Sequence, residues 1–154
     1  MKKKKKNNTL KKWAGRLHLW LGLLTGIIVF IVAVTGCVYV FHDEIKDMIY
    51  DYRFVEERET AYIAPSKIKA EVQKRYPGTT DDFVLYTGKD RPVAVYGVYQ
   101  ETPYYYYLNP YTGEFLYEQN FTEDFFEIIK SLHMYLLLPE DIGRQVVGVS
   151  TLIF

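Results

Sequence analysis

The longest feature in the pattern of apolar and polar positions is an uninterrupted apolar segment near the N-terminus. Residues 17–41 contain no aspartate, glutamate, lysine or arginine. A helix of roughly 20 residues crosses the ~30 Å hydrocarbon core of a bilayer, so this segment is long enough to span it with some tilt. Trp13 and Trp20 lie near its start and Tyr39 near its end, as is typical of interfacial aromatic residues. The pattern predicts a transmembrane helix over residues 17–41.

The pattern changes after residue 42 to that of a small α+β domain. Residues 42–62 are polar, and we expect them to extend the helix and then form a linker. A helix is predicted next, over residues 66–76, with Ser66 as its N-cap and Pro77-Gly78 as its stop signal. Ile68, Val72 and Tyr76 recur every four residues and would face a sheet.

Four runs rich in branched and aromatic residues predict strands at 83–87, 93–99, 104–108 and 114–118. With the helix at 66–76 they predict a helix packed on an antiparallel sheet within residues 63–120. The run Tyr104–Tyr107 would place two rings on each face of its strand. We expect packing against the helix, and a ligand surface formed by one pair is the alternative.

The C-terminal part combines an interfacial helix with a second apolar run. Residues 124–138 predict an amphipathic helix that contains His133, and residues 139–141 break it, so residues 121–142 form an interfacial helix and a break. Residues 146–154 are apolar, but this length of helix covers only ~13 Å. We therefore expect the sequence to be a piece of a longer protein, with residues 143–154 the start of a second transmembrane helix.

Charge adds an orientation to this pattern. The sequence has 19 lysines and arginines and 19 aspartates and glutamates, but the lysines crowd residues 1–16 and acidic residues dominate after residue 42. The positive-inside rule predicts that residues 1–16 are a cytoplasmic basic tail and that the α+β domain is extracytoplasmic, as in a protein of the bacterial inner membrane. We interpret the lysines as a lipid-surface patch and expect no nucleic acid as a partner, although RNA binding is the alternative.

The single cysteine, Cys37, excludes an intramolecular disulfide. The segment Val34-Thr35-Gly36-Cys37 resembles a lipobox, so a lipoprotein cleaved before Cys37 is an alternative. The apolar core is longer than that of a signal peptide, which favours the uncleaved helix.

One face of the predicted transmembrane helix carries small residues and a histidine. At 100° per residue a single stripe is formed by Gly15, His18, Gly22, Thr25, Gly26, Val29, Ala33 and Gly36. Small residues let another helix approach closely, which explains the glycines. A histidine in a membrane span is a candidate functional residue, and glycines beside it leave room for a flat ring such as haem. His18 is therefore either a ligand or an interfacial, hydrogen-bonded histidine.

Three segments resemble, in order along the chain, the PepSY-associated transmembrane family. Residues 16–22 (RLHLWLG) with Thr35-Gly36 are similar to its first membrane helix. Residues 107–114 (YLNPYTGE) are similar to the terminal hairpin of the PepSY domain, with Asn109 in place of the usual aspartate. Three short C-terminal segments are similar to the lead into the family's second membrane helix: Ser131-Leu132-His133, Gly143-Arg144 and Val147-Gly148. The matches cover nearly the whole chain.

The resemblance implies several membrane helices around PepSY-like extracytoplasmic modules in the periplasm. Some members reduce ferric siderophores during iron acquisition with b-type haem held by membrane histidines. On this resemblance, His18 would ligate a haem b near the cytoplasmic face and His133 one near the outer face. The other ligands would come from the remaining transmembrane helices. Gly22, Gly26 and Gly36 would provide helix packing or clearance for haem.

Two alternatives stay open beside this hypothesis. His42 lies ~36 Å along a helix from His18, so the two cannot share a haem, and we expect His42 to be a solvated helix-end residue rather than a ligand. The whole chain is either part of a haem-dependent oxidoreductase or a non-enzymatic PepSY module that binds or restrains peptidases or senses the envelope. No catalytic residue is predicted.

Overall fold

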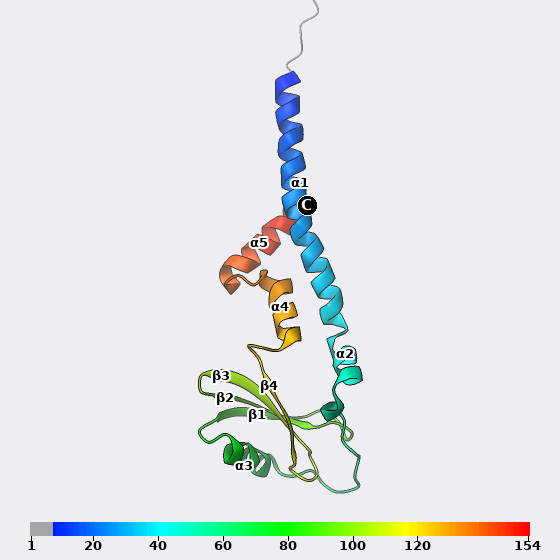
Figure 1. Cartoon of the computed structure of the whole chain (residues 1–154), viewed down its shortest axis with the longest axis vertical. Coiled ribbons are helices and arrows are strands. Elements are labelled where there is room, and N and C mark those ends of the chain that lie inside the picture. The colour runs from blue at the N-terminus through cyan, green and yellow to red at the C-terminus, as the bar shows by residue number, and fades with distance from the viewer. Residues whose placement is uncertain (1–7) are drawn as a thin grey trace, which may run out of the picture. The chain divides into compact units, whose positions relative to one another are not determined.

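The computed structural model describes residues 8–154 and divides the chain into two units (Figure 1). The described residues 8–40 and 129–154 belong to the first unit, which is helical. Residues 41–128 form the second unit, which contains the sheet. Residues 1–7 of the expected basic tail lie outside the described residues.

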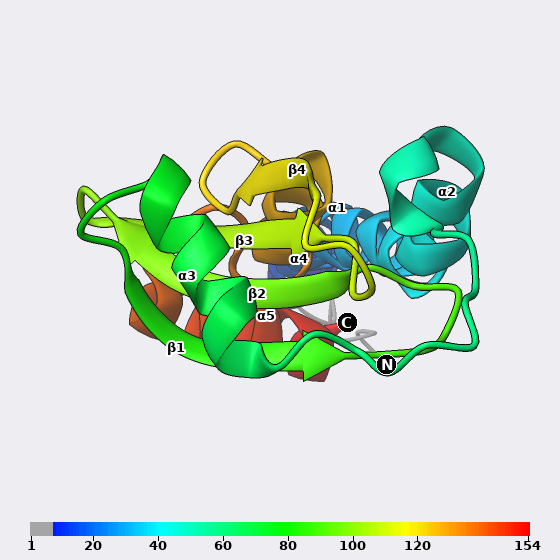
Figure 2. The same cartoon turned by 90° about the horizontal axis from the view of Figure 1, so that it is seen from below.

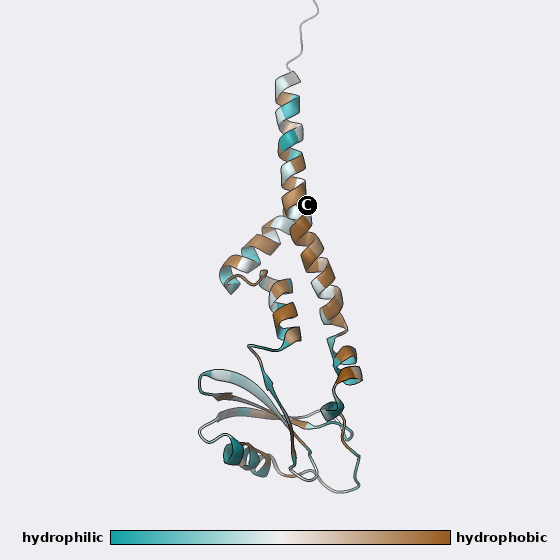
Figure 3. Ribbon diagram, in the orientation of Figure 1, coloured by the Kyte–Doolittle hydropathy of each residue, from teal (hydrophilic) through white to brown (hydrophobic). Residues whose placement is uncertain are grey.

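Helix α1 runs without interruption over Asn8–Val40 and is 33 residues long. Within the described residues the helix is already present at Asn8, ahead of the membrane span predicted to start at residue 17, because the intervening residues include good helix formers and no proline or glycine before Gly15. Most of its large apolar side chains are exposed, and Figure 3 shows apolar residues along much of its length. Among the described residues, α1 is the one helix long and apolar enough to cross a membrane.

A single residue separates α1 from the next helix. Phe41 has φ −98° and ψ 18°, and α2 follows over His42–Ile49. A short 3-10 turn, η1, covers Asp51–Arg53 before the chain becomes irregular. The expected extension of the helix after residue 42 is therefore α2, and it ends at Ile49.

Helix α3 spans Pro65–Arg75 and packs on the sheet. The expected cap by Ser66 was wrong: Pro65 is already inside the first turn, Ala64 is the N-cap, and no side chain caps the helix. Proline suits the first turn because its fixed φ is helical and its missing N–H would have no partner there. Gly78 adopts φ +88° beyond the end of the helix.

The sheet is an antiparallel meander in the order β1-β2-β3-β4, and Figure 2 shows α3 crossing one of its faces. Its strands span Thr80–Tyr86, Val93–Tyr99, Thr102–Leu108 and Phe115–Asn120. The predicted helix on an antiparallel sheet is thus confirmed, with strand ends shifted by up to three residues. β3 starts before Pro103 because Gln100 and Glu101, at φ 49° and 65°, form a tight turn from β2 without a glycine.

The turn between β3 and β4 is closed by the side chain of Asn109. Its Oδ1 accepts hydrogen bonds from the backbone N–H groups of Tyr111 (2.9 Å) and Thr112 (3.2 Å). Gly113 then takes φ +74°, which favours glycine, and its N–H donates to the Asn109 carbonyl oxygen (2.9 Å). An asparagine amide oxygen makes the same bonds as an aspartate carboxylate, so the replacement keeps the turn.

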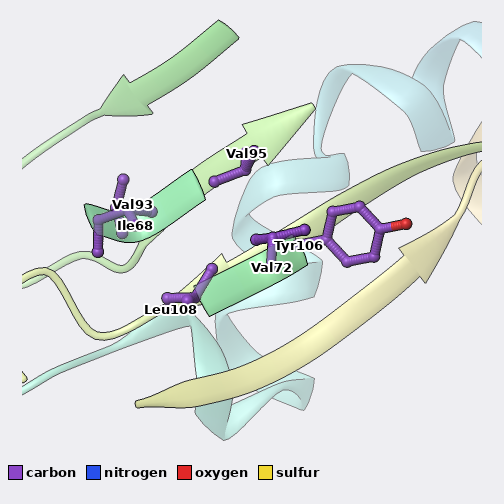
Figure 4. Close-up of a cluster of buried hydrophobic side chains, with 6 residues drawn as sticks. All are labelled: Ile68, Val72, Val93, Val95, Tyr106 and Leu108. Carbon is purple, nitrogen blue, oxygen red and sulfur yellow. The ribbon is translucent and has the colours of Figure 1, made fainter. Parts of the chain in front are cut away.

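The core of the second unit lies between α3 and the sheet (Figure 4). Fully buried side chains come from α3 and from the two central strands: Ile68, Val72, Val93, Val95, Tyr106 and Leu108. The tyrosine run alternates as predicted, because Tyr106 is buried beside Tyr76 while Tyr105 contacts Phe121. Tyr104 and Tyr106 therefore pack towards the helix, and Tyr105 and Tyr107 lie on the opposite face.

A network of ion pairs holds α2 and η1 to the start of β2. Arg91 donates two hydrogen bonds to Asp47, from Nη1 to Oδ1 (2.8 Å) and from Nη2 to Oδ2 (2.7 Å). Arg53 donates to Asp47 through Nε and to Asp43 Oδ1 through Nη2 (2.9 Å). The bonds from Arg91, opposed by partial burial and reinforced by Arg53, lower the pKa of Asp47 from 3.8 to about 2.

A second ion pair joins α2 to the start of α4, which spans Phe125–Tyr135. Lys46 is buried, and its Nζ lies 3.6 Å from Asp124 Oδ1 and 5.1 Å from the centroid of the Phe126 ring. Asp124 Oδ1 also accepts hydrogen bonds from the N–H groups of Phe126 and Glu127, both at 3.0 Å. Asp124 is thus both the N-cap of α4 and the partner of a buried lysine.

The packing of the core predicts that shortening a buried side chain of α3 strongly lowers stability. Ile68→Ala should lower the free energy of unfolding of the second unit by about 2–4 kcal/mol, because it leaves a cavity against Val93 and Leu108. Urea titration of the full chain in detergent, followed by the near-ultraviolet circular dichroism of the tyrosines, measures this. Lys67→Ala on the exposed side of α3 is the control and should change stability by less than ~0.5 kcal/mol.

The arginine–aspartate network predicts a pH-dependent stability. Because the pKa of Asp47 is lowered in the folded state, its contribution of about 2 kcal/mol is complete above about pH 4 and is lost as the pH falls towards 2. The difference in unfolding free energy between the wild type and Asp47→Asn should therefore shrink between about pH 4 and pH 2. A difference that stays constant over this range, or that is unchanged in an Arg91→Ala background, would contradict this origin.

Candidate functional site

The imidazole of His133, on α4, lies against the C-terminal third of α1. Its Nδ1 is 2.9 Å from the carbonyl oxygen of Val32 and 3.5 Å from Thr35 Oγ1. Thr35 Oγ1 itself donates to the carbonyl oxygen of Ile31 (2.7 Å). A carbonyl oxygen only accepts, so Nδ1 carries the hydrogen, and in the neutral ring the lone pair is on Nε2. His133 is thus held in the tautomer that can ligate a metal through Nε2.

Gly36 provides the space that this ring occupies. A Cβ atom at Gly36 would lie 2.8 Å from Cε1 and 3.1 Å from Nδ1 of His133, closer than side chains pack. We expected Gly36 to provide helix packing or clearance for a flat ring, and its neighbour in the structure is a side chain of α4. Within the described residues, the ring that lies against Gly36 is that of His133.

Further towards the N-terminus, the same stripe of α1 contacts α5, which spans Glu140–Ile153. A Cβ atom at Gly26 would lie 3.1 Å from the ring of Phe154, and Thr25 and Ser150 are buried. Thr25 Oγ1 donates to the Leu21 carbonyl oxygen (2.8 Å), so its polar group is satisfied within α1. This part of the stripe packs helices closely through small residues.

The N-terminal part of the stripe is open. His18 is exposed on α1, and a Cβ atom at Gly22 would meet nothing within 4 Å. His18 precedes Gly36 by 18 residues, ~27 Å along the helix, so the structure does not bring His18 and His133 into one site. No group of three or more metal-ligating side chains occurs in the part of the chain that the structure describes.

The turn from α4 to α5 explains a glycine whose role the sequence did not reveal. Leu136 and Leu137 both have positive φ, 56° and 59°, and reverse the chain sharply. A Cβ atom at Gly143 would lie 2.2 Å from the Tyr135 carbonyl oxygen, so only glycine permits this approach. The guanidinium of Arg144 covers the Tyr135 ring at 5.6 Å. The expected break at residues 139–141 therefore comes earlier, and Pro139 is already the N-cap of α5.

Comparison with known families agrees with this arrangement. The family model described as PepSY-associated TM region matches residues 15–154, which include most of α1, the sheet and both C-terminal helices. The chain belongs to the PepSY-associated TM family. In this family member, α1 is the helix long and apolar enough to cross a membrane, and His18, Gly36, His133 and Gly143 all lie inside the matched region. None of the curated proteins matches the chain.

The two remaining candidate positions have different surroundings. His42, expected to be solvated, is half-buried at the start of α2, where its ring centroid lies 6.2 Å from that of Phe126 and its Nε2 lies 3.5 Å from Asp43 Oδ2. The apolar ring of Phe126 is what covers it. Cys37 is exposed on α1. Cleavage before Cys37 stays a prediction of the lipoprotein alternative.

The close contact at Gly36 predicts that adding one methyl group there displaces the His133 ring. Gly36→Ala should push the imidazole away from Val32 and weaken the packing of α4 on α1 by about 1–3 kcal/mol. Side-chain nitrogen NMR of histidine in lipid nanodiscs should then show loss of the protonated Nδ1 signal of His133. The matched control is Gly22→Ala, where the added methyl group meets nothing, so an equal change in both variants would contradict the assignment.

Proposed function

We propose that this protein is part of a haem-b-dependent oxidoreductase of the bacterial inner membrane that serves ferric-siderophore reduction in iron acquisition. The observation that carries the proposal is the geometry of His133, whose Nδ1–H is engaged by the Val32 carbonyl oxygen at 2.9 Å. The family match supports a membrane protein and is compatible with this function.

The residues present fit a haem. Metal-ligating histidines usually donate their other ring N–H to a carbonyl oxygen or a carboxylate, which fixes the ring and raises its basicity. His133 has this arrangement with Val32, and the ring packs so closely against Gly36 that a Cβ there would lie 2.8 Å from Cε1. A haem bound here would supply one-electron transfer. The role of the chain is to present Nε2 in a fixed direction.

His18 is proposed as the ligand of a second haem, at a different depth in the membrane. It is exposed on α1, and the open backbone at Gly22 lies one turn further along the same face. Under the positive-inside rule His18 lies near the cytoplasmic face and His133 near the outer face. Each histidine needs a second ligand, which we assign to membrane helices other than those described. The ferric siderophore would be reduced on the extracytoplasmic side.

The proposal predicts the haem content of histidine variants. In the protein with its complete set of membrane helices, His18→Ala and His133→Ala should each lower the bound haem by about half, since each removes one axial ligand. The reduced-minus-oxidised absorption spectrum of the purified protein, divided by protein concentration, measures this. His42→Ala is the control and should keep the wild-type haem content.

Two results would overturn the proposal. One is a well-folded wild type without haem, which would favour the non-enzymatic module that binds or restrains peptidases or senses the envelope. The other is a loss of haem in His42→Ala equal to that in His133→Ala. Residues 1–154 expressed alone should show no reductase turnover, because each proposed haem then lacks a ligand.

A further inference from the structure

Strand β4 forms one edge of the sheet, opposite the edge formed by β1 (Figure 2). Residues 117–120 of β4 pair with residues 104–107 of β3 in unbroken register, up to the shift that follows at Leu108. Among the described elements, no strand pairs with the other side of β4. Such an edge presents backbone N–H and C=O groups that a second chain can bind.

A hydrogen bond just beyond β4 shows which of its backbone groups face outward. The N–H of Phe121 donates to the carbonyl oxygen of Pro103 on β3 (3.1 Å). In an antiparallel ladder, every second residue directs both of its backbone groups at the neighbouring strand, and the residues between direct theirs away from it. Counted back from Phe121, Glu118 and Asn120 therefore direct their N–H and C=O groups away from β3.

The turn that follows β4 uses one of these outward groups. The carbonyl oxygen of Asn120 accepts hydrogen bonds from the N–H groups of Glu123 (3.3 Å) and Asp124 (3.0 Å), which agrees with its outward direction. The N–H groups of Glu118 and Asn120 and the carbonyl oxygen of Glu118 face outward beside no other strand of the described chain. A strand laid along this edge could therefore form about three hydrogen bonds.

A cavity of about 340 Å³ lies along the same edge. Its lining includes residues 117–120, together with Glu123 and Asp124 from the following turn. Successive side chains of a strand point to opposite faces of the sheet, so a cavity lined by four consecutive residues lies beside the strand rather than on one face. The cavity is thus the space that an added strand would occupy, and the turn closes one end of it.

This cavity carries negative charge. Glu118 and Glu123 are exposed, and among the described residues no ion pair holds either carboxylate. Asp124 is different, because Lys46 Nζ lies 3.6 Å from its Oδ1 and offsets its charge. The side chain of a lysine or arginine would complement the two remaining carboxylates.

The same charge decides between the possible occupants of this edge. A second copy of β4 laid against the first would bring Glu118 and Glu123 towards the same carboxylates of its partner, and like charges across strands are destabilising. An anionic lipid surface would be repelled in the same way. An extended peptide with a basic side chain satisfies both the backbone groups and the carboxylates.

We propose that the outer edge of β4 is a docking site for an extended peptide segment that contains a lysine or arginine. The segment adds to the sheet as a further strand. Its backbone bonds to Glu118 and Asn120, and its basic side chain lies between Glu118 and Glu123. Main-chain hydrogen bonds give affinity in this binding mode, and the side-chain pocket gives specificity. The proposal is independent of haem binding and of the membrane span.

Peptide titration of the full chain in nanodiscs of phosphatidylcholine tests this docking site. The probe is a short acetylated and amidated peptide of alternating threonine and valine with one central lysine, and its matched control has glutamate at the centre. Backbone amide NMR should show saturable shifts at Glu118 and Asn120 with the lysine peptide and several-fold weaker binding of the glutamate peptide. No saturable shift at millimolar lysine peptide, equal binding of the two peptides, or equal shifts along β1 would overturn the proposal.

Variants of the chain separate the backbone contribution from the charge. Glu118→Pro removes an outward N–H and leaves the ladder to β3 intact, because an edge strand tolerates proline where its N–H faces outward. This variant should lose binding of the lysine peptide, whereas Glu118→Gln, which keeps the N–H, should weaken it only several-fold. Glu118→Lys combined with Glu123→Lys should reverse the preference, so that the glutamate peptide binds several-fold more tightly.

The near-ultraviolet circular dichroism spectrum shows whether each variant keeps the fold of the wild type. Undiminished binding to a folded Glu118→Pro variant would contradict the addition of a strand. An unchanged preference for the lysine peptide in the doubly substituted variant would contradict the role of the two carboxylates, and this second result does not depend on how the chain tolerates proline.

Discussion

The hydrogen bond between His133 and the Val32 carbonyl oxygen is possible because α1 lacks a side chain at one position. Backbone carbonyl groups inside a helix already accept one bond, but each has a second lone pair that a close neighbour can use. Reaching that lone pair requires the donor to lie almost on the helix backbone, and Gly36 permits this approach. The tautomer of the ring, the direction of Nε2 and the packing of α4 on α1 all follow from that contact.

Much of the architecture could be predicted from local patterns. The uncharged stretch gave α1, the four-residue spacing of Ile68 and Val72 gave α3, and the β-rich runs gave all four strands. The predicted ends of these elements were less accurate where a residue adopts a conformation that its type usually avoids. Pro103 lies inside β3, and Gln100 and Glu101 adopt positive φ, so composition alone placed the start of this strand too late.

The contacts between distant segments could not be predicted in this way. Asp47 and Arg91 are 44 positions apart, and no local signal relates them. His133 was a candidate from its resemblance to a family motif, but its partner Val32, 101 positions away, is an apolar residue that contributes only its backbone. Gly143 likewise serves the approach of a neighbouring backbone, which a sequence pattern cannot distinguish from a helix-packing role.

The meander order of the sheet has a consequence for biosynthesis. Every strand pairs only with the strands adjacent to it in sequence, so each pairing closes a short loop, and the entropy cost of closure stays small. Topologies with such local pairing fold quickly. The sheet can therefore assemble while the C-terminal helices are still being synthesised, and the nascent chain need not wait for them to gain its first stable domain.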